Sequence, residues 1–442
     1  MNRILLGVAA LALIIISWVI VLNSKSNSER QADLISQAEE LIDLEIYKLA
    51  APLLEEASEF NAAYTSLAEE RLKFVYLQMI EQSGYKRKYI ELLEKQTGRK
   101  DASSDSYFEL ANFYLMSSKY EDAYATLRDG IAKTGSSDLI TLYESCRYEF
   151  RMGYDVYDDV SAVYGNTVGV CIDGLWGLAD SEGMLLIPCE YEKISTYSAG
   201  RVVVQKNGVI FAVDIDNNRI AVPRDDSEHG YPGKVTDFGN FANDRLPLLI
   251  NGKWYRSTGE FELGRAVFDW IGMHTDGYAS ALSDGKWGVI NRDADWVIPA
   301  QYDEIIMDEL GQSYGQGAVF VRKGSSIYLY VNGTQLDEQY EDAKPFGDEG
   351  YAAVKKGGLW GFVDTSGNIV IPCQFEDALS FGQHLAAVKL GEFWGYINVF
   401  GEPVIEPTFL QAKSFGAGSA PVLTERGWQF ITLREYTKGV GL

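Results

Sequence analysis

The sequence predicts a protein of three unlike parts: an N-terminal transmembrane helix, a short α-helical array and an all-β repeat domain. Three observations support this fold class. A long apolar run opens the chain, and a stretch with a single proline follows it. A position that holds Trp-Gly, or a copy that has lost one or both residues, then occurs eight times at intervals of 33, 34, 40 or 44 residues. The predicted domains are residues 1–24, 25–152 and 153–442.

The composition narrows the classes of function. The formal net charge of −24 argues against nucleic acid as a partner, because phosphate binding needs clustered lysine and arginine. Four cysteines in 442 residues imply no disulfide framework, and the three histidines have no partners at metal-ligand spacing. No catalytic or phosphate-binding motif occurs, so we expect no enzymatic activity, no cofactor and no metal.

The apolar run from Ile4 to Leu22 carries no charge. Its nineteen residues would span about 28 Å as a helix, close to the ~30 Å hydrocarbon core of a bilayer. A cleaved signal peptide is the alternative, but the run ends in residues 21–25, which lack a small-residue cleavage site. Arg3 precedes the run and only Lys25 follows closely. This predicts a single-pass membrane protein with the bulk of the chain outside the cytoplasm.

The second part has helical periodicity, with apolar and small residues three and four positions apart. The clearest positions are Tyr107, Leu110, Ala111 and Tyr114 in one helix and Ala123, Leu127 and Gly130 in the next. Two such helices joined by a short polar turn form an αα-hairpin. This pattern resembles the tetratricopeptide repeat, and about three degenerate units fit between residues 25 and 152. The resemblance implies a peptide-binding groove, whereas a simple spacer is the other interpretation.

The third part is a repeat array centred on one tryptophan position, here called the tryptophan slot. The complete pair occupies Trp176-Gly177, Trp287-Gly288, Trp360-Gly361 and Trp394-Gly395, while Trp254 and Trp428 fill the slot without the glycine. Ile210 and Ile327 fit as decayed copies. Self-similarity at a fixed period indicates units that bury their apolar faces against their neighbours. We therefore expect the slot to be core, with aromatic platforms for sugars as the alternative.

Each unit has the pattern of consecutive β-hairpins. In the clearest unit, residues 351–372, short apolar runs are separated by Gly357-Gly358 and by Ser366-Gly367-Asn368. A glycine within a strand, such as Gly361, usually marks a close approach of another backbone. The unit thus contains three strands, and a short fourth segment follows it.

This pattern resembles the WG β-repeat family over about residues 155–435, and the resemblance implies no enzymatic activity. A β-propeller of seven or eight blades and an open β-solenoid both suit such units. The array lacks one strand at its end, which residues 148–152 could supply, and this favours the propeller.

Together these features predict a membrane-anchored, non-catalytic binding or scaffold protein. We expect protein partners outside the cytoplasm, attachment to the membrane by the N-terminal helix, and no nucleic acid. A cell-wall glycan is the alternative ligand, because exposed tryptophans would suit stacking on sugars.

Overall fold

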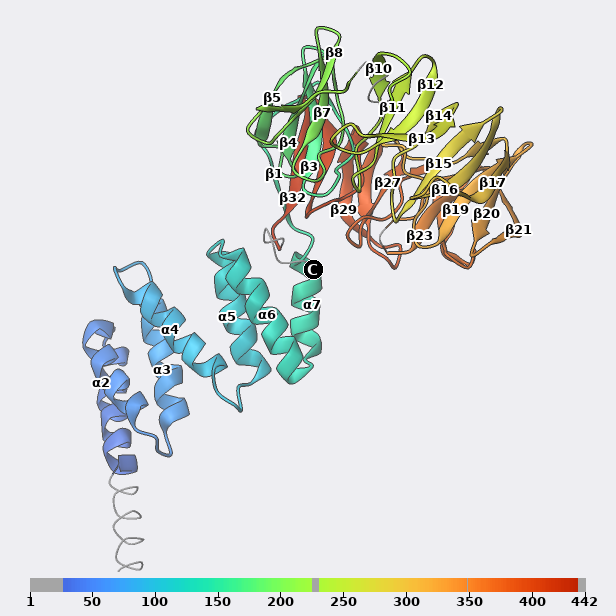
Figure 1. The fold of residues 1–442 in the computed structure, drawn as a ribbon. Coiled ribbons are helices and arrows are strands. Elements are labelled where there is room, and N and C mark those ends of the chain that lie inside the picture. Colours follow the sequence, from blue (N-terminus) through green and yellow to red (C-terminus); the bar gives the residue numbers. More distant parts are fainter. Residues whose placement is uncertain (1–26, 225–229, 348, 436–442) are drawn as a thin grey trace, which may run out of the picture. The chain divides into compact units, whose positions relative to one another are not determined.

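The structure is a computed structural model that describes residues 27–224, 230–347 and 349–435. The chain divides into two compact units, which we call the helical unit (residues 1–146) and the propeller unit (residues 147–442). Figure 1 shows helices in the first unit and strands in the second.

The helical unit consists of successive antiparallel helices. Residues 27–43 are helical, and the following helices are α2 (Tyr47–Glu59), α3 (Thr65–Gln78), α4 (Tyr85–Thr97), α5 (Ser104–Met116), α6 (Tyr120–Thr134) and α7 (Ser137–Cys146). Gly130 of α6 lies against the ring of Tyr107 on α5, where a β-carbon would stand only 2.7 Å from the ring. The small residue thus allows α5 and α6 to approach closely, as the αα-hairpin pattern requires.

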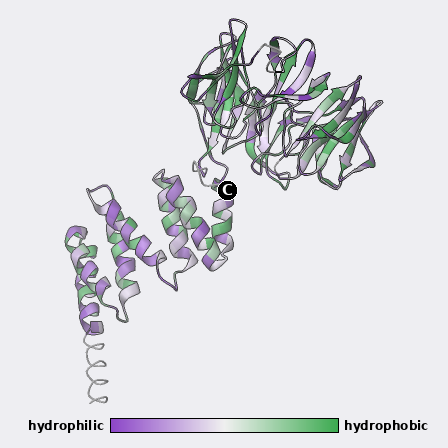
Figure 2. Cartoon of the chain, in the orientation of Figure 1, coloured by the Kyte–Doolittle hydropathy of each residue, from purple (hydrophilic) through white to green (hydrophobic). Residues whose placement is uncertain are grey.

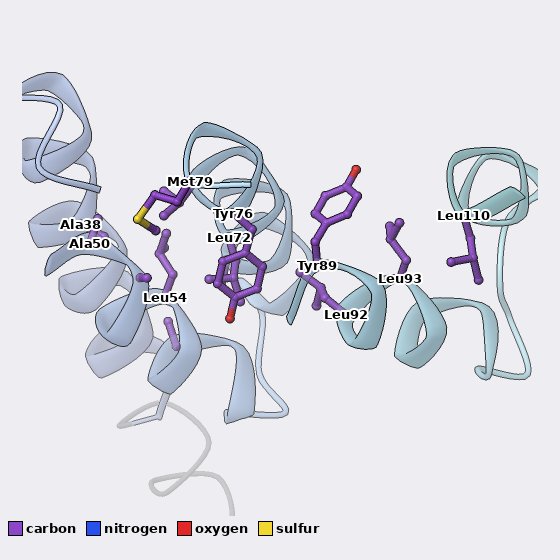
Figure 3. Packing of buried hydrophobic residues seen from close by; sticks show 14 of the residues in the cluster. Ala38, Ala50, Leu54, Leu72, Tyr76, Met79, Tyr89, Leu92, Leu93 and Leu110 are labelled. Atoms are coloured by element: carbon purple, nitrogen blue, oxygen red, sulfur yellow. The ribbon is translucent and has the colours of Figure 1, made fainter. Parts of the chain in front are cut away.

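The core of the helical unit is a layer of apolar side chains between the helices, divided into two clusters. Figure 3 shows Leu54, Leu72 and Leu93 in this layer, and each is almost completely buried. Hydrophilic residues alternate with the apolar ones along the same helices (Figure 2). Amphipathic helices of this kind are stabilised mainly by burial of their apolar faces against each other.

The membrane prediction needs correction. Within residues 27–224, 230–347 and 349–435, no helix is both long enough and apolar enough to cross a membrane. This finding contradicts the transmembrane helix in the predicted fold class and the predicted localisation as a single-pass membrane protein. The apolar run from residue 4 to residue 22, which motivated both, lies outside the described residues.

The propeller unit is all β. Its described residues form eight four-stranded antiparallel sheets, which we number as blades 1 to 8. Blades 1 to 4 comprise β2 (Asp159–Val160), β3 (Thr167–Ile172), β4 (Leu175–Asp180) and β5 (Leu185–Tyr191); β6 (Lys193–Ile194), β7 (Val202–Lys206), β8 (Val209–Val213) and β9 (Arg219–Ala221); β10 (Val235–Phe238), β11 (Leu246–Ile250), β12 (Lys253–Ser257) and β13 (Leu263–Phe268); and β14 (Trp270–Ile271), β15 (Tyr278–Ser283), β16 (Lys286–Asn291) and β17 (Trp296–Tyr302).

The remaining blades repeat the same order, with a short first strand and three longer ones. Blades 5 to 8 comprise β18 (Glu304–Ile305), β19 (Ala318–Lys323), β20 (Ser326–Val331) and β21 (Thr334–Tyr340); β22 (Asp342–Ala343), β23 (Tyr351–Lys356), β24 (Leu359–Asp364) and β25 (Ile369–Phe375); β26 (Asp377–Ala378), β27 (Ala386–Leu390), β28 (Phe393–Ile397) and β29 (Pro403–Phe409); and β30 (Gln411–Ala412), β31 (Ser419–Thr424), β32 (Gly427–Leu433) and β1 (Phe150–Met152).

Blade 8 joins the two ends of the propeller unit. Its fourth strand is β1, which pairs with β32 so that Arg151 lies opposite Thr432. This is the strand that the sequence suggested as the missing one, and the propeller is therefore observed rather than the open solenoid. An apolar cluster in which Trp428 and Phe430 contact Val160, Val168 and Val170 also links blade 8 to blade 1. A closed ring has no unpaired sheet edge between its first and last blades.

Candidate functional site at the centre of the propeller

The tryptophan slot has one structural position. Every slot tryptophan is the second residue of the third strand in its blade. These residues are Trp176 on β4, Trp254 on β12, Trp287 on β16, Trp360 on β24, Trp394 on β28 and Trp428 on β32. Trp360, Trp394 and Trp428 are buried, whereas Trp176, Trp254 and Trp287 are half-buried.

The buried tryptophans pack between blades. Trp360 of blade 6 belongs to a cluster that includes Ala378 and Val388 of blade 7. Trp394 of blade 7 contacts the cluster that contains Ala412 of blade 8 in the same way. The slot therefore supplies the bulk that fills the interface with the following blade, and such rings have little face left for a sugar.

The glycine after the tryptophan lies beneath a bulge of the fourth strand. In blade 6, Trp360 pairs with Phe375 and Phe362 pairs with Ile371, so the one residue between them on β24 faces three residues of β25. The extra residues pass over Gly361, where a β-carbon would stand 2.6 Å from the backbone nitrogen of Cys373. Gly177, Gly288 and Gly395 are equally crowded by the backbone of their fourth strands. Only glycine fits this position without moving the strand.

Copies of the slot that lack the glycine have a different register. Tyr328 stands at the glycine position of blade 5 and pairs directly with Gln339, so the irregularity comes later, between Tyr328 and Tyr330. Tyr255 of blade 3 likewise pairs directly with Val267. The loss of the glycine is therefore accommodated by a shifted bulge.

A cavity of about 710 Å³ lies among blades 5 to 8, and Ala162 and Val163 of blade 1 also line it. It is lined by the short first strands and the residues after them, which shows that these segments converge on the centre of the ring. Trp394 and Trp428 form part of its wall, together with Lys344, Lys389 and Lys413. We call this space the central cavity. Cavities of this size suit a small molecule or a few residues of a peptide.

One loop reaches from blade 5 across the centre. The connection between Glu304 and Ala318 is five residues longer than the equivalent connection from Asp377 to Ala386 in blade 7, and this accounts for most of the wide interval before Ile327. We call residues 307–312 the central loop.

The central loop is held by bonds to three other blades. The side-chain amide of Asn240 in blade 3 donates to the carbonyl of Leu310 (2.9 Å), and the amide of Met273 in blade 4 donates to that of Gly311 (3.0 Å). Lys413 of blade 8 makes an ion pair with Glu309. Asp308 organises the loop itself, since its carboxylate accepts from the amides of Leu310 and Gln312. These bonds fix the central loop, and its residues Met307, Asp308, Glu309 and Gln312 line the central cavity.

The charged side chains around the cavity differ in whether they form hydrogen bonds or ion pairs within the protein. Asp308 and Glu309 are bonded within the central loop or to Lys413, and Asp377 accepts from the amide of Ala378 (2.8 Å). Lys413 also lies over the ring of Trp428, at 5.4 Å from its centroid.

In contrast, Lys344 and Lys389 make no ion pair within the described part of the chain, although Lys344 lies 5.2 Å from the centroid of Trp360. Two lysine ammonium groups are therefore available at one cavity of an acidic protein.

Sequence reasoning did not find the residues that build this site. The sequence feature that marks this site is a Phe-Gly pair that recurs after the short first strand of a blade, at Phe346-Gly347, Phe381-Gly382 and Phe415-Gly416. A β-carbon on Gly347 would stand 1.8 Å from the carbonyl oxygen of Phe381 in the next blade. These glycines allow neighbouring blades to approach closely around the centre. The predicted tryptophans reach the cavity only through Trp394 and Trp428.

Comparison with family models gives the identity of the repeats. The model described as the WG containing repeat matches residues 176–209, 287–309, 339–360, 360–392 and 394–428. Residues 176–428 contain WG repeats. Four of the five matches begin at a slot tryptophan, and all five run into the next blade, so the sequence repeat is offset from the structural blade. The helical unit has no such match, and its resemblance to the tetratricopeptide repeat stays a prediction.

Solved structures match this chain only at low similarity. Hsv2 of Kluyveromyces lactis has 8% identity and a TM-score of 0.36, with 63% of this chain and 97% of that chain covered. The β-propeller domain of Cps50 (Swd1) from Myceliophteria thermophila has 10% identity and a TM-score of 0.34, with 64% and 99% covered. These scores are too low to bear on function. A search of curated proteins found no match.

The WG propeller offers no metal centre within the residues that the structure describes. No group of three or more His, Cys, Asp or Glu side chains is arranged to hold an ion there. The central cavity is instead a mixture of aromatic surface, lysine ammonium groups and backbone. Such a surface can bind a segment of chain through apolar contact, hydrogen bonds and charge pairing.

Proposed function

We propose that this protein is a non-catalytic interaction scaffold whose WG propeller binds a partner protein at the central cavity. The observation that carries the proposal is the cavity of about 710 Å³ with Trp394 and Trp428 in its wall and Lys344 and Lys389 beside them. Propellers bring loops from many blades to one face, and a repeat array presents a broad surface for a partner. The closed ring leaves this surface rigid before binding, which reduces the entropy lost on association.

The charges indicate the chemistry of the bound segment. Lys344 and Lys389 have no ion pair among the described residues, whereas the acidic groups of the cavity are bonded internally. A partner segment that carries carboxylates and an apolar or aromatic side chain would satisfy both lysines and fill the space beside the tryptophans. Complementary charge would also speed the encounter and choose between partners.

A charge-reversal variant tests the proposal. Affinity purification with the full chain would be compared by quantitative mass spectrometry between wild type and Lys389→Glu. Lys323→Glu is the matched control, because Lys323 is exposed at the end of β19 and lies outside the cavity.

We expect the main protein partner to be recovered at least tenfold less with Lys389→Glu and unchanged with Lys323→Glu. Equal recovery with both variants would exclude the central cavity as the binding surface. A glycan array probed with the same full chain tests the other class of ligand. Specific glycan binding without a protein partner would overturn the proposal.

A further inference from the structure

Two departures from the repeat pattern meet at the interface between blades 3 and 4. In blades 6 and 7, the aromatic residue two positions after the slot packs against the phenylalanine that follows the short strand of the next blade. The ring centroids are 4.9 Å apart for Phe362 and Phe381 and 4.8 Å apart for Tyr396 and Phe415. The equivalent positions at the interface of blades 3 and 4 hold Arg256 and His274.

His274 is buried without a hydrogen-bond partner. Only 1% of its surface is exposed, and neither ring nitrogen has a partner among the described residues. A neutral imidazole carries one donor and one acceptor, and buried polar atoms are nearly always paired. The Nε atom of Arg245 is likewise buried and unpaired in the described chain.

The surroundings of His274 are positively charged. Burial, followed by the charges of Arg256, Arg245 and Arg292, lowers the pKa of His274 to about 3, so the ring is neutral at physiological pH. Burial also lowers the pKa of the Arg256 guanidinium, and the charge of Arg245 adds to that effect.

Few carboxylates balance the positive charge of Arg245, Arg256 and Arg292 around His274. The described residues contain one ion pair to it, in which Asp244 lies 3.6 Å from Arg245. Asp293 and Asp295 act on Arg256 electrostatically but make no ion pair with it. Arg256 instead donates to the backbone carbonyl of Arg292. Several cationic donors thus converge on a buried, unsatisfied polar group.

We propose that Arg245, Arg256, His274 and Arg292 form a binding site for an oxyanion, either a carboxylate or a phosphate. Guanidinium groups match the geometry of both anions, and the imidazole N–H would supply a further donor at the floor of the site. Arg292 is exposed and Arg245 and Arg256 are half-buried, so the ligand reaches the site from solvent. Polar residues at positions that the other blades fill with apolar ones are typical of function rather than of packing.

The test is a thermal-denaturation series on the full chain at pH 7.5. Melting temperatures would be measured in sodium phosphate, sodium acetate and sodium chloride at one ionic strength, with isothermal calorimetry for affinity. We expect phosphate or acetate to raise the melting temperature by about 3 °C over chloride, since a ligand stabilises the state that binds it. The anion that gives the shift identifies the chemical source.

Variants distinguish a specific site from a general salt effect. Arg245→Gln and Arg292→Gln should each lose the shift, whereas Lys323→Gln should keep it. The pair Arg256→Phe with His274→Phe restores the residues of the other blades, so it should remain folded and lose the shift as well. No excess shift over chloride in the wild type, or an equal shift in Arg245→Gln, would overturn the proposal as an adventitious ion only.

Discussion

Gly361 lies directly beneath the backbone of Cys373, with room for a hydrogen but not for a methyl group. A β-carbon on Gly361 would be 2.6 Å from the nitrogen of Cys373 and from the carbonyl oxygen of Ile371. Both of these are backbone atoms of a paired strand and cannot move away as a side chain could. This contact explains why glycine follows tryptophan in four of the blades.

Replacement of this glycine should therefore be severe. We expect Gly361→Ala to lower the free energy of unfolding of the propeller by about 3 kcal/mol, the upper range for overpacking a tight site. Urea denaturation followed by circular dichroism measures the change. Gly153→Ala is the control, because its nearest atom would be 3.4 Å away, and it should cost less than about 1 kcal/mol. Similar losses in the two variants would show that strand crowding is not the reason for the Trp-Gly pair.

The tryptophan of the pair should matter through packing. Trp360 is 4% exposed and contacts residues of two blades, so Trp360→Ala should destabilise the propeller by about 3–5 kcal/mol. Phe400→Ala, at a turn where 81% of the residue surface is exposed, should have little effect. The same denaturation assay compares them. A Trp360→Ala protein of unchanged stability would contradict the packing role and revive the sugar-platform alternative.

Closure of the ring should depend on β1. Proline at position 151 removes an N–H from the strand that pairs with β32, whereas Arg151→Val keeps the backbone intact. We expect Arg151→Pro to lower the melting temperature by about 5 °C and to increase hydrogen exchange in β32. The valine variant should melt within about 1 °C of wild type. Unaltered exchange in β32 of the proline variant would mean that the ring does not rely on this strand.

The buried histidine predicts a dependence of stability on pH. The pKa of His274 falls from 6.5 in its ordinary state to about 3 in the folded chain. Below pH 6.5 the unfolded chain therefore binds a proton that the folded chain does not, and stability decreases as the pH falls toward 3. At pH 5 this contribution is about 2 kcal/mol relative to pH 7.5. His274→Phe should remove that part of the loss in denaturation curves at the two pH values, and equal losses in both proteins would show that His274 does not titrate in this way.

The sequence was enough to predict the repeated blades, but it was not enough to predict which residues lie together at the centre of the propeller. The large side chain of Trp360 and the absence of one at Gly361 serve contacts within one blade and with the next blade. Repetition of this pair along the sequence is therefore enough to predict paired strands and packed sheet faces. The short segment after each blade is only two or a few residues long, and its place at the centre follows from closure of the ring. The lysines Lys344 and Lys389 stand in different units and come together only in three dimensions. The central loop, residues 307–312, has the sequence of an ordinary insertion.

The interface of blades 3 and 4 illustrates the same limit. Arg256 and His274 belong to no motif in the sequence. They stand out only when they are compared with the aromatic pairs at the equivalent positions of other blades. The repeats can be aligned at the tryptophan slot, which shows which residues are equivalent. The alignment does not show which residues of successive blades are in contact, because that depends on the direction in which the propeller is wound. The apolar run at the N-terminus shows a different limit. Its length and hydropathy predicted a transmembrane helix, but no helix among the described residues is long and apolar enough to cross a membrane.

The central claim is that a partner protein binds at the cavity among blades 5 to 8. Site-specific photocrosslinking tests it most directly, with a photoreactive amino acid at Leu410, which is exposed and lines the cavity, or at Phe400, which is exposed in blade 7 but outside it. In cells that make the full chain, we predict a discrete protein adduct from position 410 that Lys389→Glu abolishes, and none of the same mass from position 400. Absence of an adduct at position 410, or the same adduct from both positions, would contradict the claim.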